Sequence, residues 1–309
     1  TGTATYKVTN SAGTVVTVNS SLPAGTYTIA VSGLSATNYD ITYQTGTLTV
    51  GKDTNPIKLT KNAETIYVLK TLDLSSFVSN AQGTVSYVVK SSTETTKGTL
   101  SGSKYTAGSL STANDNNATV VITITAAGNS NYGASSPLTF TITVQKYTAT
   151  LAWDSTTPST MTYGQTGKVA KLNATVSGGT IGAISYSSNA TGVLTVNAST
   201  GALTTAGVGT ATITATLART ATVKAGSQTR QITVNANTSG TVVVTLDPTS
   251  YYYTGSAISA TIKSVTLGGT AVTNYDVTGN SNTNVGEYTI TVTINSGAYK
   301  GSTGTAKYT

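Results

Sequence analysis

Any chemistry in this chain would rest on its carboxylates, because it has neither histidine nor cysteine. A serine–histidine–aspartate triad and a zinc site of the Cys/His type are therefore excluded. No two acidic residues stand within three positions of each other, so their spacing does not predict a paired-carboxylate hydrolase. The acidic residues are Asp40, Asp53, Asp73, Asp115, Asp154, Asp247, Asp276, Glu64, Glu94 and Glu287. We expect no enzyme activity, no catalytic or metal-ligating residue and no cofactor.

Two weaker signals concern cation binding and covalent cross-linking. The run NDNN at 114–117 contains side-chain oxygens, but one carboxylate and three amides make a poor calcium site. A hairpin turn is the favoured interpretation of this run. Lys146, Lys168 and Lys171 lie near predicted strands and could form an isopeptide bond with Asn or Asp. That reaction also needs a buried acid, and the sequence points to none.

Tyrosine is the dominant aromatic residue, with 18 copies against one Trp and two Phe. The densest cluster is Tyr251, Tyr252 and Tyr253, a candidate platform for stacking against a glycan. In an extended segment, alternation places Tyr251 and Tyr253 on one face and Tyr252 on the other. At least one side of the cluster then belongs to the core, so we favour packing over glycan binding.

The elements that position these residues are predicted to be β-strands. The chain has 69 Thr and 34 Ser among its 309 residues, and β-branched residues pack well on a pleated sheet. Runs such as TFTITV at 139–144 and YTITVTI at 288–294 place an apolar residue at every second position, which indicates strands with one buried face. Such order argues against disorder. The one plausible helical stretch is a short turn within LDLSSFVSN at 72–80, with Asp73 near its start.

The charge pattern points to no charged partner. The net charge is +7, and the 15 Lys and two Arg are scattered along the chain. No window holds the run of like charges typical of a nucleic-acid or membrane patch, so we expect no nucleic-acid partner. No stretch approaches the roughly 20 apolar residues of a membrane-spanning helix. The chain has no starting Met and no signal peptide, and we therefore expect a mature or excised segment.

A glycine turn followed by alternating residues recurs along the chain, as in GTYTIAVSG at 25–33 and GEYTITVTI at 286–294. Each copy predicts a hairpin that closes a small antiparallel sandwich. Junctions such as QKYTATL at 145–151 lack a flexible spacer, so the fold we predict is all-β, an elongated rod of tandem Ig-like antiparallel β-sandwiches. The predicted domains, called the first to fourth repeats below, are 1–52, 53–146, 147–236 and 237–309.

Several of these runs resemble known families. The third repeat resembles the group 2 bacterial Ig-like domain of invasin and intimin-type surface proteins, at Ser187, Ser188, Asn189, Val196, Gly201, Leu203 and Gly209 onward. In the first repeat, NYDITYQTGTLTV at 38–50 is similar to the close of the MBG domains of bacterial surface proteins. In the second and fourth repeats, GNSNYGASSPLTFTITV at 128–144 and YYYTGSAI at 251–258 resemble other bacterial Ig-like repeats. These resemblances imply sandwiches on a secreted or surface-attached protein, without catalytic residues.

The first repeat is shorter than the fourth when the two are aligned by their closing phrases. Residues 1–18 then fall on 261–277, and the first repeat has no counterpart of 238–260. We expect its sandwich to lack an opening strand or two and to expose unpaired edges and apolar core. Three explanations stay open: upstream strands complete it, a neighbouring subunit donates a strand, as in donor-strand pili, or the domain is a genuinely shorter one.

The residues predicted to take part in assembly lie at both ends of the chain. The C-terminal segment GSTGTAKYT at 301–309 is a candidate donor strand, although its own domain also needs it. The candidate assembly residues are Tyr6, Val8, Val15, Val16, Thr305, Lys307 and Tyr308.

These observations predict an extracellular or cell-surface bacterial structural protein, part of a filament, pilus-like fibre or stalk. Its expected partner is itself, as a homopolymer, or upstream domains of a longer chain. The alternative is a surface adhesin whose terminal domain binds a glycan or a host protein, with Tyr251, Tyr252 and Tyr253 as the candidate platform.

Overall fold

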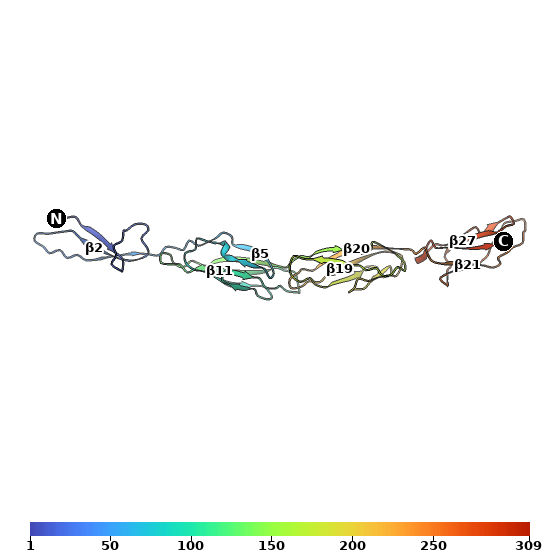
Figure 1. Ribbon diagram of the computed structural model, residues 1–309, viewed down its shortest axis with the longest axis horizontal. Helices are drawn as coiled ribbons and strands as arrows, with labels where there is room; N and C mark the ends of the chain where they lie inside the picture. The colour runs from blue at the N-terminus through green and yellow to red at the C-terminus, as the bar shows by residue number, and fades with distance from the viewer. The chain divides into compact units, whose positions relative to one another are not determined.

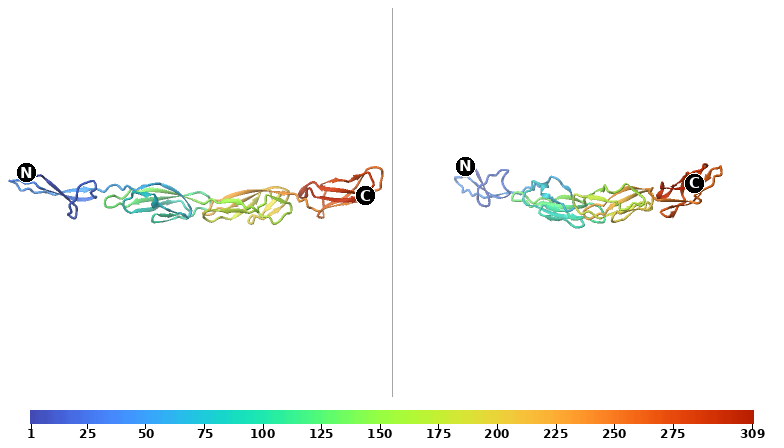
Figure 2. Two further views of the ribbon diagram at one scale, coloured as in Figure 1. Left: turned by 45° about the horizontal axis from the view of Figure 1, so that its top comes forward. Right: turned by 45° about the vertical axis from the view of Figure 1, so that its right-hand side comes forward.

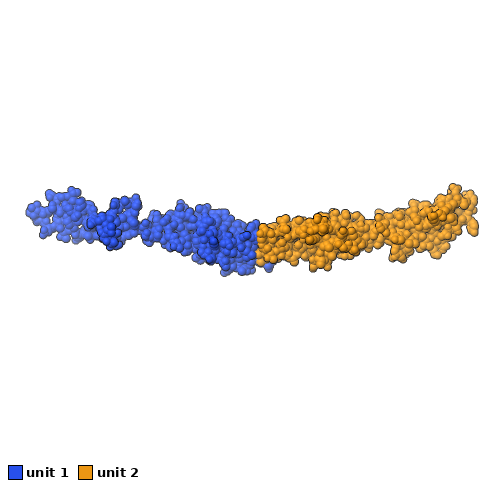
Figure 3. All heavy atoms as spheres, viewed as in Figure 1, with its two compact units in different colours: residues 1–147 blue, residues 148–309 orange.

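The chain folds into β-strands joined by loops, with two short 3₁₀ turns and no long helix (Figures 1 and 2). The computed structural model describes residues 1–309. It divides into two compact units, Thr1–Tyr147 and Thr148–Thr309 (Figure 3). No helix is long and apolar enough to span a bilayer. Each unit is described by itself below, and every strand pair lies within one of the four repeats.

The first repeat contains one three-stranded antiparallel sheet. Its strands, in the order β1-β2-β3, are β1 (Thr5–Thr9), β2 (Gly25–Ser32) and β3 (Gly46–Val50). Val8 lies opposite Ile29, and Tyr27 lies opposite Leu48. Because residues opposite each other in an antiparallel pair point to the same side, these four apolar side chains share one face of the sheet.

The second repeat has a four-stranded sheet in the order β5-β12-β11-β8, with β5 (Ala63–Tyr67), β8 (Val85–Ser92), β11 (Ala118–Ala126) and β12 (Leu138–Gln145). A three-stranded sheet, β6-β10-β9, contains β6 (Thr71–Asp73), β9 (Thr99–Ser101) and β10 (Lys104–Thr106), and β4 (Lys58–Leu59) pairs with β7 (Val78–Ser79). Alternate residues of β11 and β12 are fully buried, among them Ile122 and Ile142. The period-two pattern therefore fixes which face of this sheet meets the core.

The third repeat has the same four-stranded arrangement, β14-β20-β19-β16, with β14 (Thr160–Thr162), β16 (Ile184–Ser188), β19 (Gly209–Leu217) and β20 (Gly226–Asn235). Two smaller sheets are β13-β15, with β13 (Thr150–Trp153) and β15 (Leu172–Thr175), and β17-β18, with β17 (Leu194–Val196) and β18 (Leu203–Thr205). Its core joins Met161, Leu194, Ile213 and Ile232, which come from different sheets. This is the packing of a sandwich.

The fourth repeat has two three-stranded sheets and a short pair. The sheet β21-β23-β24 contains β21 (Val242–Leu246), β23 (Ile262–Leu267) and β24 (Thr270–Ala271), and the sheet β25-β27-β28 contains β25 (Tyr275–Thr278), β27 (Tyr288–Ile294) and β28 (Thr303–Tyr308). The short pair is β22 (Ile258–Ser259) with β26 (Ser281–Asn282). Val242 and Val265 of one sheet pack with Ile290 and Val292 of the other. The prediction of all-β Ig-like sandwiches is therefore confirmed.

The sheets are not purely antiparallel, which the alternating pattern did not indicate. The strand β5 runs parallel to β12, and β14 runs parallel to β20. In both repeats an early strand thus lies along the outer edge of the last strand, and this pairing covers an edge that would otherwise be open.

The last two strands of the first and fourth repeats correspond closely. In each repeat a tyrosine near the start of the longer strand bends back to the loop four residues earlier. The hydroxyl of Tyr27 donates to the carbonyl oxygen of Pro23 at 2.6 Å, and that of Tyr288 donates to Asn284 at 2.9 Å. Tyr27 therefore matches Tyr288, as the shared closing phrase predicts.

The alignment of residues 1–18 with 261–277 is wrong. The strand β1 pairs with β2 as β25 pairs with β27, so β1 takes the place of β25. Val15 and Val16 do not form that strand, because the Asn10 side chain accepts hydrogen bonds from the backbone of Ala12 and Thr14 and turns the chain back. Val16 then donates its N–H to Val8, along the outer edge of β1.

The predicted helical turn is confirmed as a 3₁₀ turn, η1 (Leu74–Phe77). The Asp73 side chain accepts the Ser75 N–H at its start. Leu74 is fully buried, and the ring of Phe77 stacks on Phe140 with centroids 5.0 Å apart. The second 3₁₀ turn, η2 (Gly297–Tyr299), was not predicted.

A carboxylate in the third repeat makes the stability of this repeat depend on pH. The hydroxyl and backbone N–H of Thr156 and the amide of Asn173 hold the pKa of Asp154 well below its ordinary value. The folded state thus stays ionised where an unfolded Asp takes up a proton, so this contribution is complete above about pH 4. It is lost as the pH falls further, through the folded-state pKa.

We therefore expect the calorimetric unfolding temperature of the native chain to drop below about pH 4 more steeply than that of Asp154→Asn. Thr156→Val, which removes one donor, gives an intermediate slope. Parallel curves for the three proteins between pH 5 and pH 2 would contradict the assignment.

Candidate functional site

The outer edge of β3 is the feature that separates the first repeat from the others. In the second and third repeats the last strand pairs on its outer side with β5 or β14. In the fourth repeat, Thr309 donates its N–H to the Thr249 carbonyl oxygen and accepts the Tyr251 N–H, which is the start of the same parallel pairing. The strand β3 pairs with β2 alone among residues 1–309.

The apolar face of the β1-β2-β3 sheet is also less covered than its counterpart. Ile290 and Val292 on β27 are fully buried, while the matching Ile29 and Val31 on β2 are partly exposed. Tyr27 is the single apolar side chain of residues 1–52 in the buried core of the chain. The structure thus places an uncovered face and an unpaired edge on one sheet.

Four of the predicted assembly residues gather at the β1 side of this sheet. Tyr6 lies on β1 with 71% of its surface exposed, and the Val8 side chain follows it on the same face. Val15, 58% exposed, forms a bridge with Thr9. Val16 donates its N–H to Val8 at 2.9 Å. The prediction that the first repeat exposes apolar core residues agrees with this arrangement.

The other three predicted assembly residues belong to β28 in the second unit. Lys307 forms an ion pair with Glu287 at 2.6 Å, and Thr305 pairs with Thr291 of β27. Tyr308 is buried, and its hydroxyl accepts a hydrogen bond from Asn282 at 2.7 Å. The strand that they form thus completes its own sheet, and its donation to another copy would require that sheet to open.

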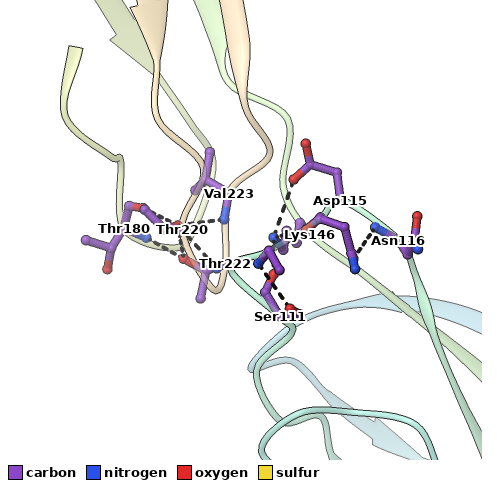
Figure 4. Close-up of polar contacts among 10 residues, drawn as sticks. Ser111, Asp115, Asn116, Lys146, Thr180, Thr220, Thr222 and Val223 are labelled. Carbon is purple, nitrogen blue, oxygen red and sulfur yellow. Dashed lines mark hydrogen bonds and ion pairs between the residues drawn. The ribbon is translucent and has the colours of Figure 1, made fainter. Parts of the chain in front are cut away.

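The NDNN run forms a turn around an internal ammonium group. Lys146 is buried, and its Nζ donates to the carbonyl oxygens of Ser111 at 2.7 Å and Asn114 at 2.8 Å (Figure 4). Asp115 Oδ1 lies 3.4 Å from the same nitrogen. The Asn114 side chain accepts the Asn116 N–H, which closes the turn. The ammonium group therefore engages the one carboxylate of the run, and its other two acceptors are backbone carbonyl oxygens.

Of the three lysines considered for cross-linking, Lys146 is the buried one. Lys168 is exposed. Lys171 forms a surface ion pair with Asp154 at 3.5 Å, with 60% of the lysine side chain exposed. The sequence did not favour an isopeptide bond, and of these lysines Lys146 is the one whose buried ammonium group lies beside a carboxylate, that of Asp115.

The sequence analysis missed a buried carboxylate in the second repeat. Glu94 accepts hydrogen bonds from the Tyr105 hydroxyl, from Ser92 Oγ at 3.0 Å, and from the backbone N–H groups of Gly98 at 3.0 Å and Gly108 at 2.7 Å. Burial and the hydrogen bond to Glu94 raise the pKa of Tyr105. Because four donors engage the carboxylate, three at Oε2 and one at Oε1, this group holds the loops together. No local signal in the sequence marks it.

The tyrosine cluster of the fourth repeat is split between core and surface. Tyr251 packs edge-on against Tyr308 at 6.1 Å, and its hydroxyl accepts the Thr261 N–H at 2.7 Å. Tyr252 and Tyr253 are 94% and 68% exposed. A cavity of about 430 Å³ lies beside them, lined by Tyr251, Tyr253, Ile258, residues 282–286, Tyr288, Tyr308 and Thr309.

Comparison with known proteins bears on the first repeat. Residues 2–49 match the model of the MBG domain, YGX type, which confirms the resemblance seen at 38–50. Among solved structures, the chain is similar to Drosophila N-cadherin EC1-4, at 12% identity over 100% of this chain and 91% of that one, with a TM-score of 0.31. It is also similar to the human Desmocollin-1 ectodomain, at 9% identity over 99% and 74%, with a TM-score of 0.27. No curated protein matches the sequence.

Removal of the buried ammonium group tests its structural role. We expect Lys146→Met to lower the free energy of unfolding in urea by about 3 kcal/mol, because two carbonyl groups and a carboxylate lose their partner. The control is Lys61→Met, which breaks an exposed ion pair with Glu64 and costs less than about 1 kcal/mol. Equal stability of the two variants would contradict this role. An intact mass one water below the calculated value would show a covalent bond instead.

Proposed function

We propose that this chain is a structural segment of an extracellular bacterial filament, pilus-like fibre or surface stalk. In this proposal the four repeats, with boundaries at 1–52, 53–146, 147–236 and 237–309, are separate Ig-like domains in an elongated rod. The match of residues 2–49 to the MBG domain supports it. The strand-rich fold with few charged residues also suits a mechanical role. The role needs no cofactor and no catalytic residue.

The observation that carries the proposal is the unpaired outer edge of β3. Elsewhere in the chain this edge is covered by a parallel strand, namely β5 on β12 and β14 on β20. We propose that a strand from outside the first repeat adds to β3 in the same parallel direction. Such strand addition derives affinity from main-chain hydrogen bonds and specificity from alternate side chains. The donor is a second copy of the chain or a preceding segment of it.

The incoming segment would also cover the apolar face beside this edge. In the fourth repeat, Val242, Leu246 and Val265 perform that task over Ile290 and Val292. Each apolar side chain moved fully out of water contributes roughly 1.5–3 kcal/mol. Covering Ile29 and Val31 therefore gives strand addition a driving force beyond its hydrogen bonds.

A second candidate function is adhesion through the tyrosine cavity of the fourth repeat. Tyr253 is exposed beside amide side chains of Asn282 and Asn284. Aromatic rings with nearby hydrogen-bonding groups suit sugar recognition. Saturable binding of a glycan to the native chain, lost in Tyr253→Ala, would favour this function over the structural one.

Fibre formation tests strand addition. We expect purified chains to form ordered fibres by electron microscopy, and Ile29→Asp to prevent them, because it places a charge on the face to be covered. The control is Thr28→Asp, which alters the opposite face of β2 and leaves fibres intact. Monodisperse chains that bind a glycan would contradict the proposal.

A second measurement does not depend on whether the variant folds. Strand addition to β3 protects its backbone amides, so hydrogen exchange within 46–50 should be slower in fibres than in dissociated chains. Equal exchange in the two states would show that β3 gains no partner.

A further inference from the structure

The loop between the last two strands of the second repeat contacts the first repeat. Asp53, the first residue of the second repeat, donates its N–H to the Asn131 carbonyl oxygen at 2.9 Å and accepts the Gly133 N–H at 2.8 Å. The Asn131 side chain accepts the N–H of Ala24, which precedes β2, at 3.2 Å. This loop, with Tyr132 next to Asn131, therefore sits on the end of the repeat before it.

The corresponding loop of the fourth repeat does the same to the third. Asn237, the first residue of the fourth repeat, donates its N–H to the Ala298 carbonyl oxygen at 2.8 Å and accepts a hydrogen bond from Ser302 Oγ at 3.1 Å. The ring of Tyr299 meets the ring of Tyr163 edge-on, with centroids 5.6 Å apart. In both joints the first residue of a repeat donates its backbone N–H to a residue of that repeat's loop, Asn131 in one case and Ala298 in the other. By this bond, Ala298 and Tyr299 match Asn131 and Tyr132.

The first repeat carries a loop of the same kind that contacts no repeat within the chain. Residues 33–45 join β2 to β3 and are exposed throughout. Asn38 and Tyr39 in this loop repeat the pair Asn131 and Tyr132, and Tyr39 is 81% exposed. Two hydrogen bonds at 2.7 Å between the Tyr43 hydroxyl and the backbone of Leu34 hold the base of the loop together.

The fourth repeat ends in a surface that matches the receiving end of the third. Tyr163 donates its N–H to the carbonyl oxygen of Asn235 at the end of β20, and Tyr251 does so to Thr309 just after β28. Tyr251 in the fourth repeat therefore corresponds to Tyr163 in the third repeat, whose ring contacts that of Tyr299. The cavity of about 430 Å³ lies at Tyr251, and no charged side chain lines it.

We propose that the loop at 33–45 of a second copy seats in this cavity and joins copies head to tail. Its Tyr39 ring lies against Tyr251 and Tyr253, and its Asn38 side chain accepts the Val285 N–H. Val285 is 85% exposed. It matches Ala24, because Val285 precedes Tyr288 by three residues as Ala24 precedes Tyr27. This joint would be the contact surface of the self-assembly proposed above, and the inference rests on that proposal.

Physical reasons favour a second copy as the occupant. The chain already uses a loop-on-end contact in both units, so a second copy would bring a loop of the same kind to a repeat end of the same kind. The loop carries one charged side chain, Asp40, and no charged side chain lines the cavity, so few charged side chains lose water on docking. Buried tyrosines are the residues that most often dominate such contacts.

Matched tyrosine variants test the joint by sedimentation. We expect self-association of the native chain, weakened about tenfold or more by Tyr39→Ala and by Tyr253→Ala. Tyr252→Ala, the adjacent exposed tyrosine that does not line the cavity, leaves the dissociation constant unchanged. A native chain that stays monomeric, or equal association in the three variants, overturns the joint.

Cross-linking gives a readout that does not depend on affinity. The chain has no cysteine, so Thr37→Cys and Asn284→Cys each introduce a single thiol. A short bismaleimide should link the two variants when they are mixed, and Tyr253→Ala added to the second variant should abolish the link. Linkage that is unchanged by Tyr253→Ala, or no linkage, overturns the joint.

The outcomes separate this joint from strand addition. Fibres that Ile29→Asp prevents, but that Tyr39→Ala and Tyr253→Ala leave unchanged, refute the joint and keep strand addition. A Thr37–Asn284 link without protection of β3 amides supports the joint and refutes strand addition.

Discussion

The pairing of sheet edges is the constraint on which this molecule depends. An exposed edge presents unsatisfied N–H and C=O groups that must be paired, covered or used. In the second and third repeats, β5 and β14 run parallel to the last strand and satisfy its outer edge. In the fourth, residues 249–251 begin the same pairing with Thr309. The first repeat has the closing strands without this partner, and its apolar face is correspondingly open.

The joints between repeats are made by loops that also connect two strands of a sheet. A loop that only needs to connect two strands also carries a tyrosine to the end of the preceding repeat. The contacts that cross a repeat boundary use side chains, the Asn131 amide oxygen on Ala24 in one joint and the Tyr299 ring on Tyr163 in the other. Backbone hydrogen bonds such as those between Asp53 and Gly133 or between Asn237 and Ala298 tie the start of each repeat to its own loop. The rings of Tyr163 and Tyr299 add a directional contact.

The few buried charges stabilise loops instead of forming a reactive site. Lys146 and Glu94 are buried, and each is surrounded by partners that satisfy its hydrogen-bonding capacity. A buried ion without such partners would cost several kcal/mol. A group whose donors or acceptors are engaged in this way holds neighbouring loops in place.

The sequence by itself determined the strands, the 3₁₀ turn at Leu74–Phe77 and the equivalence of Tyr27 with Tyr288. Alternation, capping and a shared closing phrase act between residues close in the chain. The sequence also located the repeat similar to MBG domains. The burial of Glu94, the parallel partners β5 and β14, and the place of β1 were decided by tertiary structure alone. Each depends on a partner distant in sequence, and local periodicity carries no information about which edge such a partner will meet.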